Sequence, residues 1–169
     1  MKQEIMKHKR TIIAIVAILI FFLVFSGVYT MAMDKQKSAD KQKSADTHIL
    51  SLSSEQCIYE YINAWINKDI YTLNAIYYAK NITHNNLEPY ADTPVCILSL
   101  EADEKSELHT RDSWTRFSPK GDTPLYDVDA YNTIVLFEKA SGEEYTRPFA
   151  FIFVKEMEDS PWQLYNYGY

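Results

Sequence analysis

The sequence is poor in the residues that mark common catalytic and metal sites. Among its 169 residues there are only 4 Gly, 4 His and 2 Cys. It has no Gly-rich phosphate loop and no Gly-x-Ser-x-Gly motif of the kind found in serine hydrolases. The His and Cys residues form neither a Cys-x-x-Cys nor a His-x-x-x-His pair, so the usual zinc motifs are missing. The sequence therefore predicts neither a cofactor nor a metal.

Positive charge is also in short supply. The chain has 17 Lys and Arg against 23 Asp and Glu, which gives a net charge of -6. Proteins that bind nucleic acid usually present a basic face to the phosphates, so nucleic acid is not an expected partner. Aromatic residues, in contrast, are plentiful, with 13 Tyr and 8 Phe. They supply enough apolar surface to fill a core or to line a cavity.

One long segment carries no charge at all. It runs from Thr11 to Met33, and a helix that spans a bilayer needs ~20 mostly apolar residues. Basic residues precede it, so we expect residues 1–10 to stay in the cytoplasm and the rest of the chain to lie outside. A cleaved secretory signal is the alternative, but such signals have shorter apolar stretches and end in small residues. The sequence favours an uncleaved, single-pass anchor in the cell membrane.

Residues 34–46 contain an exact tandem repeat of the hexapeptide DKQKSA, followed by Asp46. Such a polar segment has little apolar area to bury, so we expect a solvated linker. Its Lys, Gln and Ala residues also favour helix, so it could extend the membrane helix by a few turns. In both interpretations it is a spacer before an outer domain at 47–169.

The start of the outer domain has a helical pattern. Ser53 and Gln56 match a capping box, and apolar residues at i, i+3, i+4 and i+7 follow, which predicts a helix over 54–67. Asp69 can cap a second helix that begins at Ile70. The two helices are expected to form a hairpin.

Beyond residue 81 the apolar period changes to two, which is typical of antiparallel strands. We expect strands at 95–102, 107–117, 126–139, 144–156 and 162–167. A turn that contains Gly142 joins the third strand to the fourth as a hairpin. Both faces of the fourth strand are apolar, so it should be central in the sheet and covered on both sides. The fold class is therefore α+β, with a transmembrane helix followed by two helices packed on an antiparallel sheet.

Two segments carry a family resemblance. The first is YEYINAWINKD, at 59–69, and the second is WQLYNYGY, at 162–169. Together they resemble the nuclear transport factor 2-like superfamily, also called SnoaL-like or cystatin-like, and within it the extracytoplasmic domain of unknown function 4829 of Gram-positive bacteria. The resemblance implies a cone-like domain with a strongly curved sheet. Because that superfamily includes enzymes, ligand-binding domains and scaffolds, it does not imply one function.

In a cone fold the pocket lies between the first helix and the concave face of the sheet. Five aromatic residues are candidates for its walls, although in a small domain such rings can equally fill the core. These residues are Tyr61, Trp65, Phe149, Phe151 and Phe153.

Acid and base chemistry in that pocket would need a carboxylate beside a His or Tyr, as in cone-fold enzymes. Asp127 and Asp129 fall on one face of a predicted strand, ~7 Å apart, and His109 is the candidate imidazole. Acidic residues at the start of a strand also commonly point to water. Cys57 and Cys96 could form a disulfide outside the cell or remain free thiols.

Three functions are compatible with these features. The first is a non-enzymatic domain that binds a small apolar ligand or an envelope protein. The second is a scaffold subunit of an envelope or conjugative secretion machine, which has the same layout of tail, span and outer domain. The third is a cone-fold acid/base enzyme. The anchor, the spacer and the lack of a catalytic cluster favour the first.

Overall fold

The computed structural model describes residues 30–78, 92–117 and 125–168. The chain divides into two compact units, residues 1–41 and Gln42–Tyr169. The second unit has an α+β fold, in which helices pack on a four-stranded antiparallel sheet of order β1-β2-β3-β4. The fold class expected from the sequence is confirmed at this level.

Residues 30–49 are helical, and their last part belongs to the second unit. Ala45 and Ile49 are buried in its core. Gln42 donates a hydrogen bond to the carbonyl oxygen of Tyr71 (3.2 Å), in the first turn of helix α3 (Ile70–Ile76). The compact unit starts at Gln42, and the second repeat copy supplies part of it.

Most of the expected membrane segment, residues 11–29, lies outside the described residues. Within the described part of the chain, none of the helices combines the length and the apolar character that a bilayer crossing requires.

Helices α2 (Ser54–Asn67) and α3 (Ile70–Ile76) form the expected hairpin. The Ser53 side chain accepts from the Gln56 amide, and the Gln56 side chain accepts from the Ser53 amide, which completes the capping box. Lys68 ends α2 in the left-handed conformation, with φ of 54°. Asp69 then caps α3 by accepting hydrogen bonds from backbone amides in its first turn.

The strands are β1 (Thr93–Ala102), β2 (Asp127–Glu138), β3 (Glu144–Lys155) and β4 (Gln163–Gly168). β2 and β3 form a long hairpin paired without interruption from its open end to Glu138 and Glu144 beside the turn. Gly142 occupies that turn with φ of 81°, a conformation that most other residues avoid. β4 pairs only with the second half of β3, so Pro148 precedes the part of β3 that has neighbours on both sides.

The expected strand at 107–117 is wrong, because this segment forms helix α5 (Glu104–Phe117). Asp103 begins it by accepting hydrogen bonds from the Ser106 amide (3.2 Å) and hydroxyl (2.6 Å), which lower the pKa of Asp103. Trp114 holds the helix to the sheet by packing with Val128 and Val154. The helix-forming residues and the cap outweigh the weak alternation that suggested a strand.

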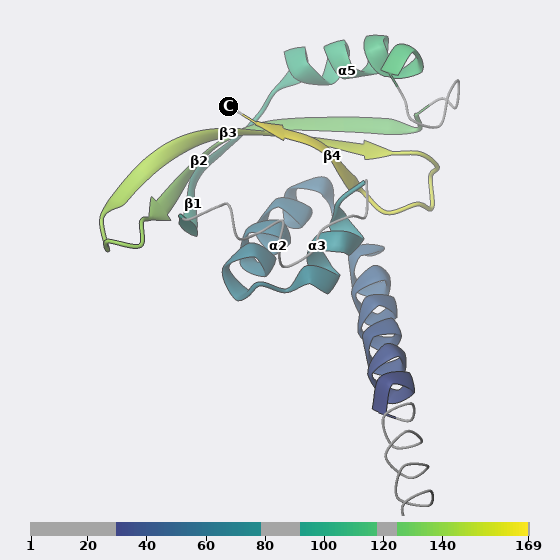
Figure 1. The fold of residues 1–169 in the computed structure, drawn as a ribbon. Helices are drawn as coiled ribbons and strands as arrows, with labels where there is room; N and C mark the ends of the chain where they lie inside the picture. The colour runs from purple at the N-terminus through teal and green to yellow at the C-terminus, as the bar shows by residue number, and fades with distance from the viewer. Residues whose placement is uncertain (1–29, 79–91, 118–124, 169) are drawn as a thin grey trace, which may run out of the picture. The chain divides into compact units, whose positions relative to one another are not determined.

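The sheet is curved and has helices on both sides (Figure 1). We call the side that faces α2 and α3 the inner face and the side that faces α5 the outer face. Odd-numbered residues of β2 and β3 lie on the inner face, where Phe137, Phe149 and Phe151 are buried. Even-numbered residues lie on the outer face. α5 covers only part of that face, around Val128 and Val154.

Candidate functional site

The five aromatic residues expected to line an inner pocket lie together in the main core. None of them is more than 7% exposed. Tyr61 meets Trp65 and Phe151 edge-on at centroid distances of 6.0 and 5.9 Å, and Phe149 stacks on Phe151 at 5.9 Å. These are ordinary distances for packed aromatic pairs. Here the space between α2 and the sheet is therefore filled by the rings themselves.

The carboxylate Asp127 is held in an ion-pair network. Arg111 of α5 donates hydrogen bonds to Asp127 and to the carbonyl oxygen of Val128, and it also pairs with Glu107. The hydrogen bond with Asp127 is the main reason that the pKa of Arg111 is raised. Asp127 thus joins the end of β2 to α5.

Asp129 is bound in a separate network. It accepts a hydrogen bond from the hydroxyl of Ser54, which is buried at the start of α2. Tyr131 lies 2.8 Å from the same hydroxyl. Since Ser54 gives its single proton to Asp129, Tyr131 must be the donor in that contact. Burial is the main reason that the pKa of Tyr131 is raised, so the phenol keeps its proton. The three residues fasten α2 to β2.

The acid and base candidates are therefore not brought together. Although Asp127 and Asp129 share one face of β2, each is engaged by a different element. His109 is exposed on α5, and its side chain forms no hydrogen bond or ion pair with either carboxylate, all three residues being described. No cluster of His, Cys, Asp or Glu suited to a metal ion occurs in the described ranges.

Both cysteines are free thiols in the structure. Cys57 is buried in α2, and its burial raises the pKa of the thiol to about 12. Cys96 is exposed on the edge strand β1. The pairing that the sequence left open is not present in this structure.

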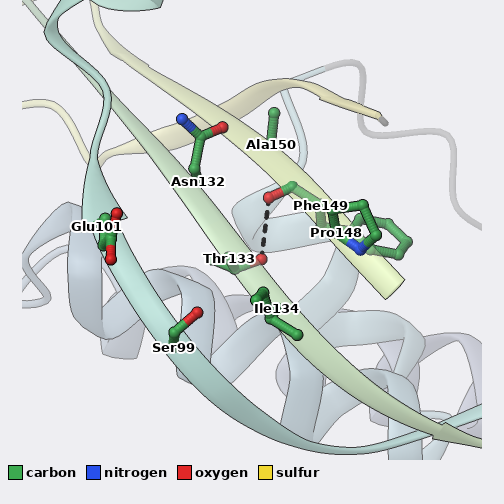
Figure 2. A pocket seen from close by; sticks show the side chains of 8 residues that line it. All are labelled: Ser99, Glu101, Asn132, Thr133, Ile134, Pro148, Phe149 and Ala150. Atoms are coloured by element: carbon green, nitrogen blue, oxygen red, sulfur yellow. Dashed lines mark hydrogen bonds between the residues drawn. The ribbon is translucent and has the colours of Figure 1, made fainter. Parts of the chain in front are cut away.

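A hollow of about 290 Å³ lies instead on the outer face of the sheet, beyond the area that α5 covers. It spans three neighbouring strands, and Ile134 of β2 and Pro148 of β3, both drawn in Figure 2, are direct cross-strand partners within it. Ile134 is 43% exposed, so its apolar surface is open to a partner. The residues that line the hollow are Ser99, Glu101, Asn132, Thr133, Ile134, Pro148, Phe149 and Ala150.

The hollow has a rigid floor. β2 and β3 are paired along its whole length, and Thr133 donates a hydrogen bond to the carbonyl oxygen of Phe149 (3.0 Å) beneath it. On the other side of the same strands, the buried Phe149 and Phe151 fix the sheet on α2. The surface is therefore preformed, which lowers the entropy cost of binding.

The charge of the outer face is acidic. Glu138 and Glu144 are direct cross-strand partners at the end of the hairpin, and both are exposed. Glu101 lies at the other end of the hollow. Among the residues of β1 to β3 that the pairing assigns to this face, none is Lys or Arg.

The sequence did indicate part of the outer face. Strand alternation puts Asn132, Ile134 and Leu136 on one face, opposite Thr133, Val135 and Phe137. What it could not show is that α5 would leave this stretch uncovered. No protein-family model matches the chain, and neither the characterised proteins nor the solved structures include a significant match.

Proposed function

We propose that this chain is a non-enzymatic binding protein of the bacterial cell envelope, held in the membrane by residues 11–33. Its compact unit would lie outside the cytoplasm and recognise a protein partner through the outer face of the sheet. One observation carries the proposal: the inner face is closed by a packed aromatic core, whereas the outer face is open, hollowed and preformed.

The packed inner face argues against an apolar small molecule as the ligand. Pockets for such ligands enclose most of the ligand surface, typically in ~300–1,000 Å³. Here the inner space is occupied by five rings, and the outer hollow of about 290 Å³ is open to solvent. An open surface of this size suits a few side chains of a protein partner better than an enclosed ligand.

The contacts of the candidate acids argue against enzymatic catalysis. A general base must reach the proton that it removes, at ~2.6–3.2 Å or through one water. Asp127 is paired with Arg111, and Asp129 is bound to Ser54. Neither lines the outer hollow. The resemblance to nuclear transport factor 2-like domains stays part of this proposal, and the two helices packed on a curved sheet support it.

Site-specific photocrosslinking in living cells tests the proposal. A photoreactive phenylalanine analogue would replace Ile134 on the outer face or, as a control, Tyr59, which is 45% exposed on α2. We expect one discrete, heavier adduct from position 134 and none from position 59. A second change, Pro148→Asp, should abolish that adduct while the protein level stays constant. Equal adducts at both positions, or none at position 134, would refute the proposal.

A further inference from the structure

We infer that the outer face receives an extended polypeptide segment whose side chains on one side, taken every second residue, are basic at the two ends and apolar between them. This inference rests on the function proposed above and specifies the chemistry of the partner. It is carried by the way in which carboxylates and exposed apolar groups are arranged on β1, β2 and β3.

The first observation is a pair of negative charges that face each other across the hairpin. Glu138 and Glu144 stand directly opposite each other, and like charges at such positions destabilise a hairpin. Neither carboxylate has a hydrogen bond or ion pair within the described residues, since Lys139 pairs with Glu143 instead. A cation from a partner, placed between the two carboxylates, would relieve their repulsion and gain two attractions.

The second observation is the apolar row between the acidic ends. Ile134, Pro148 and Ala150 follow each other across β2 and β3, with Glu101 at one end and the Glu138 and Glu144 pair toward the other. Acidic, apolar and acidic groups thus succeed one another along the strands. A segment in extended conformation presents side chains to one side every second residue, ~6.6 Å apart, and can match this order.

The same charges disfavour other occupants. Two copies of this chain, facing each other through this surface, would bring six carboxylates together without a cation from either sheet face. Anionic lipid headgroups and nucleic acids carry the same sign as the surface and would be repelled. A basic segment is the occupant whose charge complements the face.

The test uses the full chain in a non-ionic detergent and three fluorescent octapeptides. One, the Lys-Val peptide, has the sequence Lys-Ser-Val-Ser-Val-Ser-Lys-Ser, which places Lys, Val, Val and Lys in turn on one side of the extended chain. The Glu-Val peptide has Glu in place of Lys, and the Lys-Ser peptide has Ser in place of Val. Fluorescence anisotropy measures binding at 50 mM salt. We expect the Lys-Val peptide to bind most tightly, and its affinity to fall as salt is raised, because exposed charge pairs are screened. The Glu-Val and Lys-Ser peptides should bind at least fivefold more weakly.

The variant Glu144→Lys separates binding from folding. It replaces a repulsive cross-strand pair by an attractive one, so the melting temperature should rise, by about 2–4 °C. The same change should weaken binding of the Lys-Val peptide about fivefold, in keeping with the modest strength of exposed ion pairs. Glu158→Lys, a charge reversal in the exposed turn before β4, is the matched control and should leave binding unchanged.

A second charge reversal, Glu101→Lys on β1, decides the result if Glu144→Lys perturbs the fold. Weaker binding in this variant supports the inference. Equal binding of the Glu-Val peptide, or unchanged binding in both charge reversals, overturns it. Photocrosslinking from position 134 would still occur in that case, so failure of this inference is distinguishable from failure of the proposed function.

Discussion

Phe151→Ala is expected to destabilise the domain strongly. The side chain of Phe151 is fully buried at the middle of β3. It stacks on Phe149 at 5.9 Å and meets Tyr61 of α2 edge-on at the same distance. It thus contributes both to packing within β3 and to the contact between the sheet and α2.

The magnitude follows from what the truncation removes. Replacing a buried Phe by Ala typically costs ~3–5 kcal/mol, because apolar burial is lost and a cavity remains. Aromatic pairs add ~0.5–1.5 kcal/mol beyond burial, and Phe151 takes part in two. We therefore expect a loss of about 4 kcal/mol in the free energy of unfolding. A domain with a total of ~5–15 kcal/mol would then be close to unfolding at room temperature.

Urea unfolding of a fragment that begins at Asp34 measures this loss, and that fragment keeps both repeat copies. Ile134→Ala on the outer face is the control. Because Ile134 is 43% exposed, its truncation should cost less than ~1 kcal/mol. The reasoning would be refuted by a loss below ~1 kcal/mol for Phe151→Ala with an unchanged slope of the unfolding free energy against urea concentration. That result would mean that the rings surround open space, and the inner face would again be a candidate binding site.

Two further predictions concern the repeat and the cysteines. Ala45→Glu should lower the melting temperature by more than ~4 °C, because Ala45 is buried, whereas Ala39→Glu at the equivalent, exposed position of the first copy should not change it. Equal melting temperatures would show that the second copy does not dock. A membrane-impermeant maleimide should label Cys96 in intact cells but not Cys57, whose buried thiol has a pKa of about 12, and Cys96→Ser should abolish the labelling. Labelling that occurs only after lysis would contradict the proposed location outside the cytoplasm.

The elements that the sequence predicted best are those specified by local chemistry. The capping box at Ser53 and Gln56 fixes where α2 begins, and its apolar residues recur with the helical period, so the predicted range 54–67 is the observed one. The β2–β3 hairpin is specified in the same way by strand alternation on both sides of the turn at Gly142. Both predictions depend on interactions between residues close together in the chain.

The missed helix α5 shows what local patterns leave out. Only Thr110 and Trp114 are buried among the side chains described on it, so its apolar stripe is too narrow to give a clear helical period. The usable signal was Asp103, whose side chain caps the helix through Ser106. Its docking depends on Val128 and Val154, which are distant in sequence, and this long-range packing could not be read from the segment itself.

The two repeat copies are a second case in which local sequence patterns cannot predict the structure. Their sequences are identical, yet Ala39 is exposed and Ala45 is buried. No propensity or period can separate two identical hexapeptides. The difference arises because the second copy directly precedes the domain and meets α3 through Gln42. The sequence alone therefore could not show that the second copy takes part in the compact unit.

The position of the candidate site follows from the different roles of the two faces of the sheet. The inner face forms the core, and part of the outer face is left uncovered. The inner face cannot be opened cheaply, since each buried ring that moves out of the core costs a large part of the ~5–15 kcal/mol that keeps the domain folded. Residues of the uncovered outer face, such as Ile134 and Pro148, contribute little to that total because they remain partly in water. They can therefore vary to fit a partner without unfolding the domain. The binding surface proposed on the outer face is therefore compatible with a filled core, whereas one on the inner face is not.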